Sequence, residues 1–515
     1  MTNVENLMNR RNWLVRAAIL SLYSLATALS FAAGPAKIDR VVIAQGVYPV
    51  SFDPHRSIDI PSRNIHANIY DTLLVRDQKL QLAPSLAESY KRIDDNTWEF
   101  KLRKNVVFQN GEPFDAKDVK FSIDRVLSAN EKSPQRGWIN TVTSVQVVDN
   151  STVRIVTNGP DPVLPARLTL IFMVPDQYVK EVGTEKFATN PVGTGPYKIG
   201  KWERGDYLDL DANPTYWGKA PIVKQARFRT IADTAARLAA LRSGDVQLTT
   251  NLPADYLESI KKTAGLTVST APSSRVMFIA LVNTKKGPLQ DVRVRQAINH
   301  AVDVKAIING VLLGYGNRSG SVNGHLLRLL GTDYKEPLYD YNPAKAKQLL
   351  SAAGYPNGFE ISLDSPNGRY PMDKDISQVV ASQLRQVGIK VNVKLNEWGS
   401  YAQKFTTHNT EPMYMLGWSL PSLDPDHWAT PMLATGEPIS NFQSEKVNKL
   451  ITSARVTLDP QKRTAIYKEL NNAVHEEAPW LFLFQPVDIY GVSKLISWTA
   501  RSDEGLNLVD ITFPN

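Results

Sequence analysis

Residues 376–395 have the sequence ISQVVASQLRQVGIKVNVKL, and this stretch decides the class of the fold. Ile376, Val380 and Leu384 recur at helical spacing until Gly388, a residue type that commonly follows the end of a helix. After this glycine, apolar and polar residues alternate, which is the period of a β-strand. A helix that leads through a glycine into a strand is typical of a crossover connection, so we predict an α/β fold.

The same order of elements recurs through the middle and the end of the chain. Asp291, Asp303 and Asn342 each precede an apolar helical pattern, in the position where their side chains cap a helix. Helices are predicted at 235–242, 291–301, 303–311, 342–354 and 461–478, and strands at 246–248 and 480–484.

The first third of the chain predicts a compact α+β unit. Residues 41–44 form an apolar run typical of a buried strand, and residues 98–102 alternate as in a half-buried strand. Asp115 can cap a helix that places Val119 and Ile123 on one face. Residues 145–155 contain two short alternating runs around a turn, which indicates a hairpin.

Length and composition limit the possible classes of protein. The 515 residues are 43% hydrophobic and 21% charged, which is ordinary for a globular chain of about three domains. There is no cysteine, so disulfide frameworks, thiolate metal sites and cysteine-linked lipid anchors are excluded. The net charge is +8, but basic and acidic residues are interspersed, so we expect no nucleic-acid partner.

Residues 1–33 resemble a secretory signal. Arg10, Arg11 and Arg16 form a basic region before an uncharged apolar run at 17–31, which is shorter than a membrane span requires. Cleavage is expected after Ser30 or after Ala33; a retained membrane anchor is the alternative. Because no later stretch could cross a membrane, we expect a soluble periplasmic protein that is not a lipoprotein.

The residues that catalysis or metal binding would require do not form a recognisable motif. The seven histidines are scattered, and none belongs to a close ligand pair. The run 417–421 lacks the second glycine of a nucleophile elbow, and the run 193–198 is neither a dinucleotide fingerprint nor a phosphate-binding loop. We therefore expect no enzyme activity, no catalytic residue, no cofactor and no metal.

Several segments, in order and with their spacing, are similar to the family 5 solute-binding proteins of ABC importers, the receptors for peptides, nickel and opines. The similarity extends over essentially the whole chain after the signal. The segments are 70–74 with 82–89, 98–125, 191–198 (PVGTGPYK), 292–303, and Gly417-Trp418 with 424–426.

The resemblance implies an α/β periplasmic-binding-protein fold of cluster C type, with two lobes, an extra α+β domain on lobe I and a hinge. A ligand that touches both lobes only when they are closed would drive closure. It also implies delivery to permease subunits in the inner membrane, and a monomer. The expected boundaries are 1–33 for the signal, 34–65 with 190–275 and 486–515 for lobe I, 66–189 for the extra domain, and 276–485 for lobe II.

Two positions distinguish this chain from ordinary peptide receptors of the family. Those receptors hold the ligand's ammonium with an acid shortly after Gly-Trp, and Pro421 resembles that position here. Asp424 is the alternative acid. Arg369 resembles the arginine that binds the ligand's carboxylate, and a guanidinium suits carboxylate or phosphate. This chain therefore agrees with the family pattern at the anion-binding position and departs from it at the usual cation-binding position.

We therefore expect a small anionic ligand, such as an opine or a phosphorylated sugar. A di- or oligopeptide receptor is the alternative of the same class. A secreted hydrolase is the alternative from another class, and a nickel or haem receptor is a third option. Aromatic rings can stack on sugars, and polar side chains can bind hydroxyl groups. The further expected site residues are Tyr48, Trp398, Tyr401, Trp418, Ser419, His427 and Asn441.

Overall fold

The computed structural model describes residues 39–514, apart from 322–323, 325–326, 328–331 and 421. The predicted signal, residues 1–33, and the site residue Pro421 therefore lie outside the described residues. Residues 40–515 group into one compact unit, and the account below concerns that unit. Within its described part, no helix combines the length and the apolar composition that a membrane crossing requires.

The stretch that decides the fold class forms the predicted helix and strand. Helix α13 (Asp373–Arg385) buries Ile376, Val380 and Leu384, and strand β16 (Ile389–Asn396) follows. Gly388 between them has a φ of +93°, a conformation that favours glycine. Strand β16 pairs in parallel with β15 (Phe359–Pro366), so the crossover prediction is confirmed.

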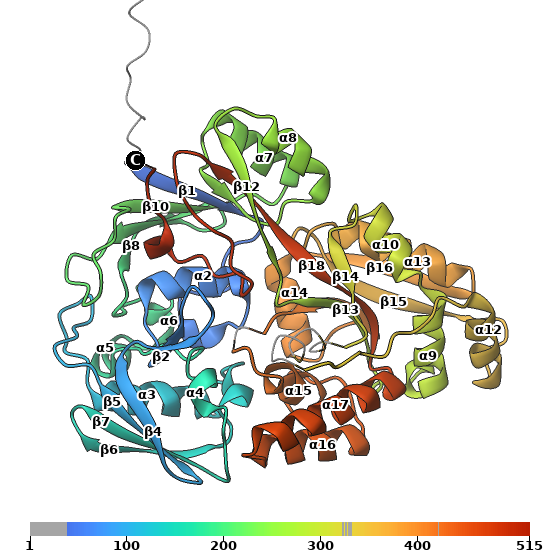
Figure 1. Ribbon diagram of the computed structural model, residues 1–515, viewed down its shortest axis with the longest axis horizontal. Helices are drawn as coiled ribbons and strands as arrows, with labels where there is room; N and C mark the ends of the chain where they lie inside the picture. The colour runs from blue at the N-terminus through green and yellow to red at the C-terminus, as the bar shows by residue number, and fades with distance from the viewer. Residues whose placement is uncertain (1–38, 322–323, 325–326, 328–331, 421, 515) are drawn as a thin grey trace, which may run out of the picture. The chain divides into compact units, whose positions relative to one another are not determined.

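One large mixed sheet carries most of the strands (Figure 1). Its order is β16-β15-β17-β13-β18-β11-β1-β10-β9-β8, with β12 and β14 also paired to β18. The bounds are β1 Arg40–Gln45, β8 Tyr197–Glu203, β9 Tyr207–Ala212, β10 Gln225–Thr230, β11 Leu248–Thr249, β12 Leu266–Pro272, β13 Val276–Leu281, β14 Gly316–Arg318, β17 Met413–Trp418 and β18 Trp480–Ser493.

Strand β18 connects the two halves of this sheet. It pairs with β13 as far as Phe484 and with β12 from Val487 onward. The predicted strand at 480–484 was too short, because the backbone remains extended through Pro486 while the pairing partner changes. The predicted strand at 246–248 is also displaced, since β11 begins only at Leu248.

The change of partner along β18 occurs where lobe I and lobe II were expected to meet, at residues 275–276 and 485–486. The domain boundaries themselves remain a prediction.

The segment expected to form the extra domain contains a second sheet. Its strands are ordered β4-β5-β7-β6, with bounds Ala87–Asp94, Thr97–Leu102, Thr152–Thr157 and Val142–Asp149; a separate pair joins β2 (Leu74–Arg76) and β3 (Leu82–Pro84). Helix α3 (Ala116–Leu127) packs on this sheet and begins with a capping box formed by Asp115 and Asp118. The hairpin and the capped helix predicted here are confirmed.

Helices pack against both sheets (Figure 1). The predicted helices after Asp291, Asp303 and Asn342 are confirmed, each with the expected side-chain cap. The remaining bounds are α2 Ile60–Ile69, α4 Leu164–Arg167, α5 Asp176–Val182, α6 Thr184–Phe187, α7 Thr234–Ser243, α8 Leu257–Lys261, α9 Val292–Ala301, α10 Val304–Gly310, α12 Pro343–Ala352, α14 Trp398–Thr406, α15 Asp426–Leu433, α16 Glu445–Val456, α17 Pro460–Glu477, and the short 3-10 turn η2 Arg136–Trp138.

Candidate functional site

A small cavity of about 40 Å³, here called the central cavity, lies between helix α2 and the carboxyl ends of β15 and β17. One wall comes from the start of α2 and the chain near η2. The other comes from the loop after β15, from α14 and from the chain after β17. The lining side chains with polar or charged groups are Asp59, Arg63, Trp138, Arg275, Arg369, Tyr370, Trp398, Trp418, Ser419 and His427.

Arg369 is the buried cation of this cavity. It is 3% exposed, and its guanidinium lies 4.7 Å from the ring centre of Tyr370 and 5.1 Å from that of Trp398. Among the described residues, no carboxylate forms an ion pair with it, and its Nε has no hydrogen-bond partner. Burial, and next the nearby Arg275, lower its pKa. A buried guanidinium without an anion is costly, so this position favours a bound anion.

The backbone around Arg369 is held in place by a single carboxylate. The side chain of Asp373 accepts hydrogen bonds from the backbone N–H groups of Gly368, Arg369 and Tyr370 at 3.0–3.1 Å. Asp373 belongs to the first turn of α13, the helix that the sequence predicted. The backbone that carries Arg369 is therefore held by the first turn of α13.

Arg275 lies beside Arg369 but is already neutralised. Its Nη2 donates to both carboxylate oxygens of Glu504, at 2.5 and 2.7 Å, and its Nη1 donates to the carbonyl of Gly417 at 2.7 Å. Arg275 is therefore already paired within the protein, whereas the guanidinium of Arg369 can still bind an anion.

Arg63 brings a third guanidinium to the central cavity, from the opposite wall. It belongs to α2, donates to the carbonyl of Thr169 at 3.2 Å and lies 5.5 Å from the ring centre of Phe172. Burial lowers its pKa to about 10, and no carboxylate within the described residues forms an ion pair with it. The sequence analysis missed Arg63, because a single arginine early in a helix carries no motif.

Trp398, Trp418, Ser419 and His427 also line the central cavity, as the sequence analysis expected. The Trp398 indole Nε1 and the His427 Nδ1 are buried without a hydrogen-bond partner, so each is free to bind a ligand oxygen. Burial lowers the pKa of His427 to about 3, so its imidazole is neutral at physiological pH. The His427 ring lies 5.2 Å from that of Trp138 on the other wall.

Four further expected site residues do not line the central cavity. Tyr48 lies against Phe52. The buried hydroxyl of Tyr401 donates to the carbonyl of Met415, and Asn441 bonds to His408 and Tyr414. The Asp424 carboxylate accepts two hydrogen bonds from Arg463, at 2.7 and 2.8 Å. Asp424 is therefore already paired with an arginine of the chain itself, which disfavours it as the acid that binds an ammonium group.

A wider groove, here called the outer groove, continues from the central cavity. It encloses about 840 Å³ and shares Ile58, Asp59, Trp398 and Phe405 with that cavity. Its far side comes from the chain between 128 and 136, and its other side from α14 and the segment at 438–439. A ligand that begins at Arg369 therefore has room to extend toward the outer groove.

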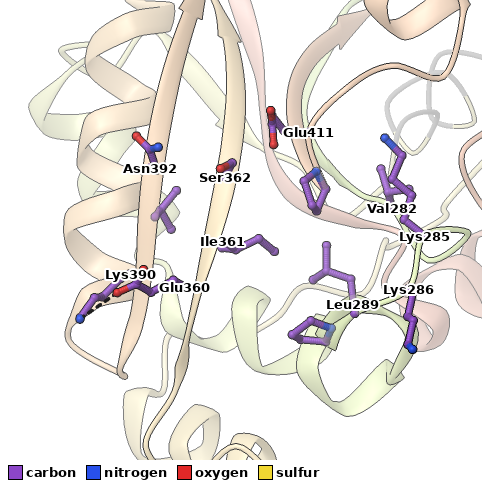
Figure 2. A pocket seen from close by; sticks show the side chains of 14 residues that line it. Val282, Lys285, Lys286, Leu289, Glu360, Ile361, Ser362, Lys390, Asn392 and Glu411 are labelled. Atoms are coloured by element: carbon purple, nitrogen blue, oxygen red, sulfur yellow. Dashed lines mark hydrogen bonds and ion pairs between the residues drawn. The ribbon is translucent and has the colours of Figure 1, made fainter.

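A separate edge pocket of about 630 Å³ lies between strands β15 and β16 and the chain near 285–289 (Figure 2). Two of its three lysines are already partnered: Lys390 pairs with Glu360 at 3.0 Å, and Lys285 donates to the carbonyl of Thr410. None of the expected site residues lines this pocket. We therefore place the candidate site at the central cavity.

Comparison with known proteins identifies the family and the fold that the sequence analysis predicted. The model of the bacterial extracellular solute-binding proteins, family 5, matches residues 81–438. The glutathione-binding protein GsiB of Shigella flexneri is 28% identical over 509 residues, which cover 95% of this chain and 96% of the relative.

Solved structures with the same fold bind different classes of ligand. DppA of Helicobacter pylori in complex with the peptide STSA is 25% identical, with a TM-score of 0.85 over 92% of this chain and 98% of that one. AgaA of A. tumefacien R10 in complex with agropinic acid is also 25% identical, with a TM-score of 0.85 over 92% of this chain and 99% of that one. The predicted two-lobed α/β fold is therefore confirmed, whereas these structures leave the ligand open.

Proposed function

The chain belongs to the family 5 bacterial extracellular solute-binding proteins, and from this premise we propose that it captures a small anionic solute, an opine or a phosphorylated sugar. As a member of that family, it is a periplasmic binding receptor of an ABC importer and not an enzyme. We further propose that residues 1–33 are a signal that is removed by cleavage. The mature protein then acts as a monomer and delivers the solute unchanged.

The observation that carries the proposal is the buried guanidinium of Arg369, which has no carboxylate partner among the described residues. A carboxylate or phosphate would accept two parallel hydrogen bonds from it, which is the strongest arrangement for such a pair. Binding would remove the cost of an unpaired buried charge, so part of the affinity comes from relief of that cost.

Arg63 supports a ligand that touches both walls of the cavity. It lies on α2, in the segment expected to form lobe I, whereas Arg369 lies in the segment expected to form lobe II. An anion with two acidic groups, or with one acid and several hydroxyl groups, could contact both at once. Such a ligand binds the closed state better than the open one, which is the condition for ligand-driven closure.

A peptide receptor remains the second candidate, and the size of the outer groove favours it, whereas the named relatives include both peptide and opine receptors. The outer groove of about 840 Å³ offers room for a chain longer than a single sugar derivative. GsiB is named for glutathione and DppA was solved with a peptide, while AgaA was solved with agropinic acid.

Two experiments test the proposal. Native mass spectrometry of the protein purified from its own host would identify any small molecule that co-purifies. Calorimetric titration with agropinic acid, mannopinic acid, glutathione, glucose 6-phosphate and the dipeptide Met-Leu would then rank the classes. Tight binding of unmodified Met-Leu, with no binding of the opines or the sugar phosphate, would favour the peptide receptor instead.

A further inference from the structure

Strand β15 lacks a neighbour along part of its length, on the side opposite β16. It pairs with β16 along its whole length, but with β17 only at Leu363 and Asp364. Alternate residues of a parallel strand direct their backbone groups to opposite sides, so the stretch 359–362 turns some N–H and C=O groups away from β16. Among the described residues, no loop or turn forms a backbone hydrogen bond with 359–362. This half of β15 therefore presents an open edge to which another strand can pair.

The chain before β17 does not fill this edge, because its polar groups are bonded elsewhere. Pro412 has no N–H, and its carbonyl accepts a hydrogen bond from the N–H of Val282 at 3.0 Å. The N–H of Glu411 donates to a carboxylate oxygen of Asp364 at 2.9 Å. The edge pocket of about 630 Å³ lies between the amino half of β15 and this chain (Figure 2).

The edge pocket has an apolar floor beside the open edge of β15. Figure 2 shows that Ile361 points from β15 toward Leu289, with Val282 on the same side of the pocket as Leu289. All three side chains are buried. Side chains of an extended segment alternate between its two faces, so a segment paired with β15 would place every second side chain on this floor.

Lys285 and Lys286 give the facing wall of the edge pocket a positive charge (Figure 2). Lys285 donates to the carbonyl of Thr410, and neither lysine forms an ion pair with a carboxylate of the described residues. The two glutamates of the pocket, Glu360 and Glu411, already pair with lysines of β16, at 3.0 and 2.6 Å. The charge that remains uncompensated is therefore positive, and it is complementary to an acidic partner.

We propose that the edge pocket binds an extended acidic segment of a partner protein, which adds as a strand to residues 359–362 of β15. Backbone hydrogen bonds to the open edge supply affinity, and acidic side chains that pair with Lys285 and Lys286 supply specificity. An apolar side chain of the same segment packs on Ile361. The edge pocket lies at the amino end of β15, whereas the central cavity lies at its carboxyl end. The inference is therefore independent of the solute and does not rest on the proposed function.

Three synthetic peptides test this inference by fluorescence polarisation. The first is a labelled seven-residue peptide in which valine and aspartate alternate; the second has the same sequence with every backbone amide N-methylated; the third has lysine in place of aspartate. We expect the first to bind at least tenfold more tightly than the others, because methylation removes the N–H donors and lysine is repelled by the pocket. The first peptide should also slow hydrogen exchange in 359–362, while exchange in β8, the edge strand at the other end of the sheet, stays unchanged.

Charge reversal tests the role of the two lysines. The double variant Lys285→Glu with Lys286→Glu should bind the aspartate peptide at least tenfold more weakly and should bind the lysine peptide more tightly than the wild type does. Lys286→Glu alone, at an exposed position, should change both affinities in the same directions. Lys347→Glu, at an exposed position of α12 outside the edge pocket, is the matched control and should bind as the wild type does. Thermal unfolding checks that each variant is folded.

Several outcomes would overturn the inference. The aspartate peptide might bind no more tightly than its N-methylated form, or leave exchange in 359–362 unchanged, and either result would show that no strand is added. Failure of the aspartate peptide to bind, or an unchanged affinity in the folded charge-reversal variants, would show that the pocket does not select an acidic segment. None of these results depends on whether the central cavity binds an anion.

Discussion

Arg167 of α4 and Asp426 of α15 form a buried ion pair, although 259 positions separate them in the chain. Both side chains are 3% exposed, and Arg167 also pairs with Asp161 at 2.8 Å. Residue 167 belongs to the segment expected to form the extra domain and residue 426 to the segment expected to form lobe II. Close to this pair, the rings of Trp138 and His427 meet across the central cavity. The ion pair therefore joins these two segments beside the central cavity.

We expect Arg167→Met to lower the free energy of unfolding by about 3–5 kcal/mol, because two buried aspartates lose their shared cation. The variant should also shift the ligand-free protein toward an open state, since the aspartates can regain water only when the walls separate. Urea unfolding measures the first effect, and the radius of gyration from small-angle X-ray scattering measures the second.

Lys120→Met is the control for this substitution, because Lys120 forms an exposed pair with Asp124 at 2.6 Å. Its loss should change stability by less than about 1 kcal/mol and leave the radius of gyration unchanged. If Arg167→Met were as compact and as stable as the wild type, the ion pair would have no role in closure.

Arg369→Met should reduce affinity for the anionic ligand by about 100-fold or more, because the ligand loses a charge-assisted contact in a buried site. The ligand-free variant should be at least as thermally stable as the wild type, since the substitution removes a buried charge without a partner. Calorimetry and thermal unfolding measure the two effects. A large loss of stability would instead indicate a structural arginine.

Arg63→Gln should weaken binding by about tenfold, less than Arg369→Met, because Arg63 already donates a hydrogen bond to the carbonyl of Thr169. The ligand-induced compaction seen in scattering should also diminish, as the ligand loses a contact on the α2 wall. The exposed Arg242→Gln serves as the control. Unchanged affinity in Arg63→Gln would show that the ligand contacts only the wall that carries Arg369.

The stability of the protein should fall as the pH drops below about 6.5, partly because of His427. Burial lowers its pKa to about 3 in the folded protein, so only the unfolded chain binds a proton between these two values. The unfolded state is therefore favoured increasingly toward low pH, and the effect is absent above the unfolded pKa. For His427 alone the loss is on the order of 2–3 kcal/mol at a pH of about 4.5.

The comparison of His427→Gln with the wild type in urea unfolding from pH 7.5 to pH 4.5 isolates this contribution. The variant should lose less stability over that range. His408→Gln, at an exposed position, should follow the wild type. Parallel curves for the wild type and His427→Gln would show that His427 takes up a proton without unfolding.

Local patterns in the sequence were sufficient to predict where several helices begin and end. The capping residues Asp115 and Asp291 and the glycine at 388 determine where helices begin and end, and these are interactions between near neighbours. The long strand β18 was underestimated, because its second half is extended by pairing with β12, which is distant in sequence. Trp398, Trp418 and His427 could be anticipated as lining residues, whereas Tyr401 could not be distinguished from the core.

By itself, the sequence determined the α/β class, the resemblance to a solute-binding family, and Arg369 as the candidate anion-binding residue. Only the tertiary structure decided which charges are free. Asp424 is paired with Arg463, and Arg275 with Glu504, while Arg369 keeps an unpaired group in the central cavity. The reason is that the charge available to a ligand depends on the partners and burial of each side chain, and residues far apart in the chain supply both.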